Sequence, residues 1–205
     1  SYSDKTPKLS TQIHAVKTLV RELNLKRINI CGLSYGGFLV LGYANKFPED
    51  LNTLCIVDSP GHVITDEEID EFCKSIGVND IKEAFVPKNQ QAVDRLHQFS
   101  FYKPPPLPKF IQKQALGIYF SKYPEKQKDL LDELPTNRKL ISGQTTMPTL
   151  ILWGEEDEIF KVQNAFELQK AIGSETSIIE KAGHALPGEK NKEFNERYKL
   201  FLEEH

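Results

Sequence analysis

Ser34, Asp157 and His184 are residues of this 205-residue sequence whose types could together carry out chemistry. A serine hydroxyl near neutral pH is a poor nucleophile. It needs a base to take its proton and a carboxylate to hold that base in the right tautomer. A serine, a histidine and an aspartate supply these parts. The chemistry they would support is nucleophilic attack on an acyl group, followed by release of the acyl-enzyme by water.

The surroundings of Ser34 predict a sharp turn between a strand and a helix. The run 28–33 is mostly apolar and predicts a buried strand, and the run 38–47 predicts a buried helix because it is apolar on two faces. A strand that turns into a helix at G-x-S-x-G is typical of a nucleophile elbow, which lifts the serine hydroxyl above the sheet. We expect Gly32 and Gly36 to be required because a Cβ at either position would collide with the strand or the helix.

Asp157 and His184 also follow predicted strands. Asp157 comes three residues after the apolar run 149–154, and His184 ends the segment that follows the shorter run 176–179. In an open parallel sheet, functional groups collect beyond the carboxyl ends of the strands. We therefore expect both side chains to converge with Ser34 at one edge of a sheet.

The order of the predicted elements is typical of an α/β protein that carries an insertion. A strand predicted over 51–58 follows the elbow helix, and strand, helix and strand in this order predict a parallel sheet with crossover helices. Residues 62–146 show helical patterns and a proline-rich connector without a strong strand signal. We expect these residues to form a helical cap between two parts of one α/β core, 1–61 and 147–205.

Three motifs in the chain resemble the signature sites of the α/β-hydrolase superfamily. They are Gly32-Leu33-Ser34-Tyr35-Gly36-Gly37, Leu152-Trp153-Gly154-Glu155-Glu156-Asp157 and Ala182-Gly183-His184. The resemblance implies an α/β-hydrolase fold in which Ser34 is the nucleophile, Asp157 the acid and His184 the base, in the chain order of the superfamily. It also implies that the backbone N–H of Tyr35 donates to an oxyanion hole.

Other residues compete for these roles. Asp58 ends the second predicted strand, where some hydrolases keep their acid, and it is the alternative to Asp157. His62 follows the same strand at the entrance of the predicted cap and is a candidate for the wall of the pocket. His14 and His97 lie in helical patterns, which is typical of surface or packing histidines.

The resemblance implies a serine hydrolase that cleaves a carboxylic ester of a small or acyl-chain substrate, without a metal or organic cofactor. The proline-rich stretch 101–111 is similar to that of capped monoacylglycerol lipases and related carboxylesterases. We expect Leu107 and Phe110 from this stretch to bind substrate in an apolar pocket above Ser34, with Phe99, Phe101 and Phe120 as further candidates for its lining. Two alternatives remain open: a carbon–carbon bond hydrolase with the same triad, and a non-catalytic hydrolase-like binding protein or fragment that needs its N-terminal half.

Composition and charge argue against several other classes of protein. The net charge of −3 and the pI near 6.0 predict no bulk attraction to nucleic acids or anionic membranes. No apolar run approaches the roughly 18–20 residues of a membrane span, and no signal-peptide pattern is present, so we expect a cytoplasmic protein. The three cysteines lack metal-binding spacing, and Cys31 and Cys55 are expected core thiols because they lie in apolar runs.

The resemblance also implies strands that these residues do not contain. The sheet of the superfamily has eight strands, but only about 27 residues precede the strand predicted over 28–33. Residues 1–7 are similar to the loop that follows the fourth strand of the superfamily. Without its neighbour, 28–33 would be a bare sheet edge, and the oxyanion hole would have one donor instead of two. We therefore expect an N-terminal partner segment, either a separate chain or residues outside this numbering.

Overall fold

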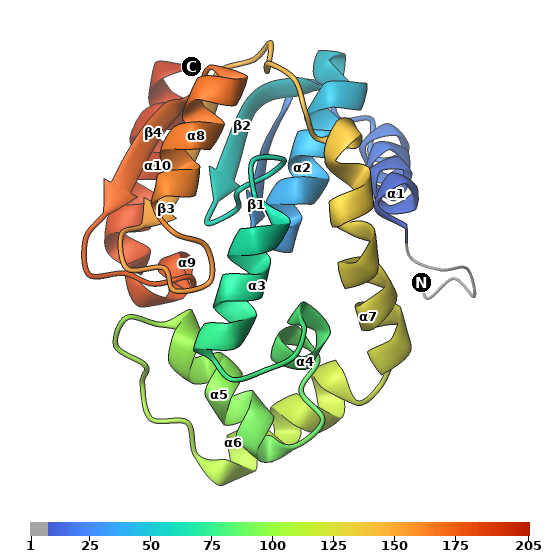
Figure 1. Ribbon diagram of the computed structural model, residues 1–205. Coiled ribbons are helices and arrows are strands. Elements are labelled where there is room, and N and C mark those ends of the chain that lie inside the picture. The colour runs from blue at the N-terminus through green and yellow to red at the C-terminus, as the bar shows by residue number, and fades with distance from the viewer. Residues whose placement is uncertain (1–7) are drawn as a thin grey trace.

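A parallel β-sheet organises the computed structural model, which describes residues 8–205 (Figure 1). Its strands are hydrogen-bonded in the order β1 (Ile28–Leu33), β2 (Leu51–Val57), β3 (Thr149–Gly154) and β4 (Glu175–Ile179). Each neighbouring pair runs parallel, which confirms the predicted α/β class. The predicted similarity of residues 1–7 to a loop of the superfamily lies outside the described residues.

The two central strands are buried on both faces. Every residue of β3 is buried, and in β2 only Asn52 is partly exposed. Continuous apolar runs are typical of parallel strands that helices cover on both sides, and this is why the sequence predicts these strands so well. The bounds of β1 and β3 match the predicted runs.

Helices cover both faces of the sheet (Figure 1). On one face, α1 (Leu9–Glu22), α2 (Tyr35–Lys46) and α8 (Gln163–Ile172) contribute buried apolar residues to the larger core. On the other face, α10 (Asn191–Glu204) contributes two phenylalanines to a smaller core with β2, β3 and β4. None of these helices, nor any other helix in the described part of the chain, is both long and apolar enough to cross a membrane.

β1 lies at one edge of the described sheet, and it pairs with β2 alone among residues 8–205. Cys31 and Leu33 pair in register with Cys55 and Val57, which belong to the core under α10. That core contains no residue of β1, so Cys31 is exposed and Leu33 keeps 40% of its surface exposed. The prediction that Cys31 is a core thiol is therefore wrong in this structure, whereas Cys55 is buried as predicted.

The chain between β2 and β3 forms helices and loops without a strand. Its elements are α3 (Asp66–Ser75), α4 (Ile81–Phe85), α5 (Gln90–Ser100), α6 (Lys109–Ala115), the π-helical turn η2 (Leu116–Phe120), α7 (Pro124–Glu133) and the 3-10 turn η3 (Pro135–Leu140). Figure 1 shows this cap beyond the ends to which the strand arrows point. Two short elements lie outside it, the 3-10 turn η1 (Pro48–Asp50) and α9 (Leu186–Glu189).

An aromatic cluster holds the first cap helices together. The ring of Phe72, on α3, lies 5.9 Å from that of Phe85 and 5.4 Å from that of Phe99, measured between ring centroids. Thr65 begins α3 with a reciprocal capping box, in which its hydroxyl accepts from the Glu68 N–H and the Glu68 carboxylate accepts from the Thr65 N–H. Local capping and aromatic packing therefore both stabilise this part of the cap.

Replacing Phe99 by alanine should destabilise the cap. Phe99 is 5% exposed, so the substitution leaves a cavity among the aromatic rings and should lower the free energy of unfolding by about 3–5 kcal/mol. Urea unfolding followed by circular dichroism measures the change. Phe110→Ala is the matched control, because Phe110 is 65% exposed and its loss should cost less than about 0.5 kcal/mol. Equal losses in the two variants would contradict the packing described for Phe99.

Candidate active site

Ser34 occupies a strained backbone conformation between β1 and α2. Its φ of 54° and ψ of −119° place a non-glycine residue in a region that L-amino acids rarely adopt. Two backbone hydrogen bonds hold it there: the Ser34 N–H donates to the Val57 carbonyl (2.9 Å), and the Gly37 N–H donates to the Ser34 carbonyl (2.8 Å). This is the geometry of a nucleophile elbow, with the serine at the carboxyl end of the strand.

The glycines around Ser34 are required for different reasons. A Cβ on Gly32 would overlap the carbonyl oxygen of Gly36, and a Cβ on Gly37 would overlap the side chain of Ser59 at the end of β2. A Cβ on Gly36 would meet no atom within 4 Å, apart from its chain neighbours and the backbone of its own helix. The prediction that a Cβ at Gly36 would collide with the strand or the helix is therefore wrong. Gly37 provides the second close approach, which joins the elbow to the neighbouring strand.

Asp157 and His184 form a buried, hydrogen-bonded pair. Nδ1 of His184 lies 2.8 Å from Oδ2 of Asp157, and the two residues are 7% and 5% exposed. The other carboxylate oxygen accepts hydrogen bonds from the N–H groups of Ile159 (2.8 Å) and Phe160 (3.1 Å). Because Asp157 occupies Nδ1, the Nε2 atom of His184 is the one left to act as a base.

Two glutamates form hydrogen bonds with the backbone of the loop that carries His184. The Glu156 N–H donates to the Ala182 carbonyl, and the Glu156 carboxylate accepts from the Ala182 N–H, each at 3.0 Å. The Glu189 carboxylate accepts from the N–H groups of Gly183 (2.9 Å), Tyr102 (3.1 Å) and Lys103 (2.8 Å). Glu156 therefore joins the histidine loop (180–185), which carries His184, to the acid loop (155–162), which carries Asp157. Glu189 joins the histidine loop to the cap.

Asp58, the alternative acid, has a different environment. It is fully buried at the end of β2, and its Oδ1 accepts a hydrogen bond from the Gly154 N–H (2.8 Å). Burial, followed by the charge of nearby Asp157, raises the pKa of Asp58 well above its ordinary value. A carboxyl group that favours its neutral form is a poor partner for a histidine that must become charged. The geometry therefore places His184 with Asp157.

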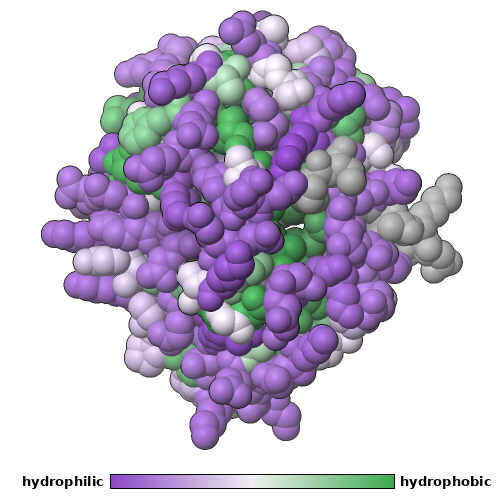
Figure 2. All heavy atoms as spheres, in the orientation of Figure 1, coloured by the Kyte–Doolittle hydropathy of each residue, from purple (hydrophilic) through white to green (hydrophobic). Residues whose placement is uncertain are grey.

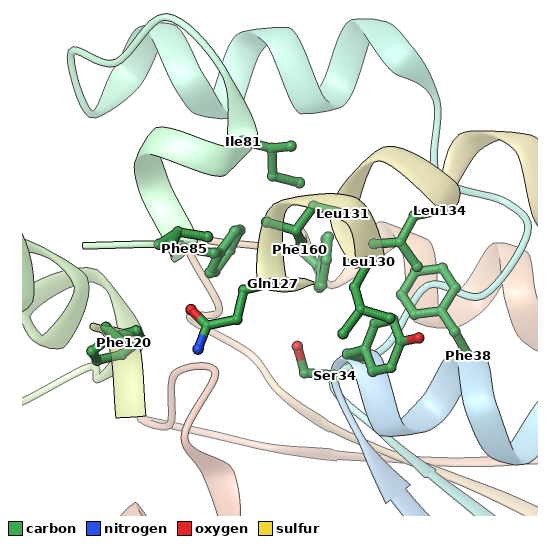
Figure 3. A pocket seen from close by; sticks show the side chains of 12 residues that line it. Ser34, Phe38, Ile81, Phe85, Phe120, Gln127, Leu130, Leu131, Leu134 and Phe160 are labelled. Carbon is green, nitrogen blue, oxygen red and sulfur yellow. The ribbon is translucent and has the colours of Figure 1, made fainter. Parts of the chain in front are cut away.

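A cavity of about 210 Å³ lies between the elbow and the cap. Its lining residues come from α2, α4, η2, α7 and the acid loop: Ser34, Tyr35, Phe38, Ile81, Phe85, Val86, Phe120, Gln127, Leu130, Leu131, Leu134 and Phe160. Figure 2 shows a hollow with hydrophobic residues inside it, and Figure 3 shows the lining side chains around it. The ring of Phe160 packs edge-on against that of His184, 5.5 Å between centroids, so the histidine lies directly behind this wall.

Not every residue expected at the pocket lines it. Leu107 and Phe110 are absent from the lining, and Phe110 is 65% exposed on α6. His62 is also absent from it, and its Nδ1 lies 3.0 Å from the Ile141 carbonyl oxygen. Of the other candidates, Phe120 lines the cavity, whereas Phe99 and Phe101 do not. Part of the wall comes from a helix face that was not predicted to line the pocket, with positions 127, 130 and 131 of α7 and Leu134 at its C-cap.

Tyr35 lines the cavity and starts α2. As the first residue of α2, it has a backbone N–H without a carbonyl inside the helix to bond, which is compatible with the expected role in an oxyanion hole. Its hydroxyl accepts a hydrogen bond from Nε2 of Gln12 (2.7 Å), and burial raises the pKa of Tyr35 to about 12. The phenol is therefore neutral near pH 7, and the expected contribution of this residue is its backbone N–H.

Comparison with known proteins places this geometry among hydrolases. A family model described as serine aminopeptidase, S33, matches residues 4–191. Lipase 1 of Psychrobacter immobilis is 29% identical over 180 residues, which are 85% of this chain and 55% of that protein. Monoacylglycerol lipase ABHD6 of Homo sapiens is 25% identical over 176 residues, which are 80% and 51% of the two chains. The chain thus spans about half the length of these curated relatives.

A solved structure agrees with the sequence comparisons. A lipase candidate from Acinetobacter baumannii superimposes with a TM-score of 0.83 at 26% identity, over 99% of this chain and 70% of that one. The agreement covers the sheet, the elbow and the cap together, because nearly all of this chain is aligned. It supports the predicted α/β-hydrolase fold.

Replacing Asp58 by asparagine should make stability less sensitive to pH. Because the pKa of Asp58 is raised by folding, the folded chain keeps a proton that the unfolded chain releases above about pH 4, so this residue lowers the free energy of unfolding as pH rises. Asparagine keeps an acceptor for the Gly154 N–H and does not titrate. In urea unfolding experiments between about pH 5 and pH 8, the free energy of unfolding of Asp58→Asn should rise relative to that of the wild type as the pH increases. A difference that stays constant with pH would contradict the raised pKa.

Proposed function

This chain belongs to the family described as serine aminopeptidase, S33, and from that premise we propose that it is a serine hydrolase acting on carboxylic esters. The observation that carries the proposal is the apolar cavity that Ser34 lines, with the Asp157–His184 pair behind its wall. Curated relatives named as lipases and monoacylglycerol lipases support the same class of substrate.

The lining of the cavity favours an ester over a peptide with a free amino terminus. An aminopeptidase must hold a charged ammonium group, and burying a charge without an opposite charge is costly. The described lining residues are apolar except for Ser34, Tyr35 and Gln127, and none of them is acidic. An uncharged acyl chain is the group that such a wall would hold at the lowest cost in free energy.

In the proposed reaction, Nε2 of His184 removes the proton of the Ser34 hydroxyl, and Oγ attacks the acyl carbon. The Tyr35 N–H stabilises the oxyanion of the tetrahedral intermediate, and Asp157 stabilises the imidazolium. The ester C–O bond breaks as His184 returns the proton to the leaving alcohol. His184 then deprotonates a water that attacks the acyl-enzyme, which releases the acid and restores the serine.

In a protein that includes the flanking segment proposed below, Ser34→Ala should abolish both labelling by a fluorophosphonate probe and hydrolysis of short p-nitrophenyl esters. Asp157→Asn should retain the fold but lower kcat by on the order of a thousandfold or more, because the histidine loses the partner that holds its tautomer. His14→Ala is the control, since His14 is exposed on α1 and should leave the rate unchanged. Probe labelling of Ser34→Ala at the wild-type level would refute the proposal.

We also propose that a strand outside residues 1–205 pairs with β1 and supplies a second oxyanion donor. Among residues 8–205, β1 has no strand on its outer edge, and this edge and the exposed side chains of Cys31 and Leu33 support the proposal. An oxyanion hole with a single donor would be slower by on the order of a hundredfold or more. An exposed parallel edge next to the nucleophile is also a risk for aggregation.

The 205 residues expressed alone should therefore aggregate or fail to react with the fluorophosphonate probe. Supplying the natural flanking segment, in the same chain or as a second chain, should restore a monodisperse and reactive particle. Intact-mass spectrometry combined with size-exclusion chromatography checks which species is present. A monomeric, soluble and hydrolytically active species of 23.4 kDa would overturn this expectation.

A further inference from the structure

One polar atom in the wall of the cavity has no hydrogen-bond partner among the residues that the structure describes. This atom is Oε1 of Gln127, which is buried and accepts no hydrogen bond. Gln127 shares the inner face of α7 with Leu130 and Leu131, which Leu134 continues at the C-cap, and Gln127 is the only polar residue among these four lining residues. A polar residue inside an apolar stripe is an exception to the pattern of the helix.

The hydrogen bond at the amide nitrogen of Gln127 fixes the orientation of the amide group. Its Nε2 donates to the backbone carbonyl of Tyr119, which can only accept, so the oxygen must be the atom left free. Buried acceptors in native proteins are almost always paired, because an unpaired one loses its hydrogen bonds to water. We therefore expect Oε1 of Gln127 to accept a hydrogen bond from a molecule that binds in the cavity.

Ser34 lines the same cavity, and Figure 3 shows the two side chains directed into one hollow. A molecule whose ester group reaches Ser34 would therefore also contact the wall that carries Gln127. A neutral hydroxyl is the donor that fits best. An ammonium group would bring a charge into a lining that has no acidic side chain to balance it.

We propose that Oε1 of Gln127 accepts a hydrogen bond from a hydroxyl group of the substrate, which makes Gln127 a specificity-determining residue. The substrate class is then an ester that carries a free hydroxyl in addition to its apolar chain. This inference rests on the proposed ester hydrolysis at Ser34. The hydroxyl could belong to the leaving alcohol or to the acyl chain, and the chemistry at Gln127 would be the same.

The first experiment compares two matched pairs of esters. Glyceryl monobutyrate against propyl butyrate tests a hydroxyl on the alcohol, and ethyl 6-hydroxyhexanoate against ethyl hexanoate tests a hydroxyl on the acyl chain. In one pair, the wild-type protein should show a kcat/KM about tenfold higher for the hydroxylated ester. The pair that shows the preference identifies the source of the hydroxyl.

Two variants test whether Gln127 is responsible. Gln127→Met keeps a side chain of similar length without an acceptor, so it should remove the preference, chiefly by raising kcat/KM for the plain ester. Leu130→Met is the matched control on the same helix face and should keep the preference. No preference in either pair, or a preference that survives Gln127→Met, would overturn the inference and mean that water satisfies Oε1.

A binding measurement separates this inference from the proposed function. Titration calorimetry compares 1-O-hexylglycerol with hexyl propyl ether, neither of which contains an ester to cleave. Tighter binding of the glycerol ether that disappears in Gln127→Met supports the role of Gln127 even if no ester is hydrolysed, in which case only the proposed function fails. Ester hydrolysis without any hydroxyl preference leaves the proposed function standing and refutes the role of Gln127.

Discussion

The positive φ of Ser34 is the constraint on which the site depends. Holding a non-glycine residue there costs on the order of 1–3 kcal/mol, and the surrounding structure must supply that free energy. It does so through the bond to the Val57 carbonyl and through two close approaches, at Gly32 inside the elbow and at Gly37 against Ser59. The register between β1 and β2 therefore determines where the serine hydroxyl lies.

The strands could be predicted from the sequence because they form mostly apolar runs. β2 and β3 are buried on both faces, whereas β1 is mostly apolar although Cys31 and Leu33 are exposed in this structure. The runs 28–33 and 149–154 are apolar throughout most of their length, and the structure gives β1 and β3 the same bounds. The short helix α4 gives no such signal, since its five residues are too few to show a helical period. It nevertheless contributes Ile81 and Phe85 to the cavity, so this part of the wall could not be predicted.

The role of a side chain was harder to predict where it depends on whether that side chain points inward or to solvent. The resemblance of the stretch 101–111 to capped lipases suggested Phe110 for the pocket, but α6 turns Gln112 inward to bond Asp94 and leaves Phe110 outside. In the acidic run 155–158, the two middle side chains point inward and the two outer ones point to solvent, which no pattern indicated. Glu156 and Asp157 bond the histidine loop, whereas Glu155 and Glu158 are exposed.

The carboxylate of Glu189 has a mechanical consequence. It is shared between the Gly183 N–H, next to His184, and two N–H groups of the cap segment at 102 and 103. A displacement of that segment must either pull the histidine loop along or break these bonds. In the ester hydrolysis proposed above, a movement of this cap segment would therefore change the position of His184 relative to Ser34, so the arrangement of the site depends on where the segment lies.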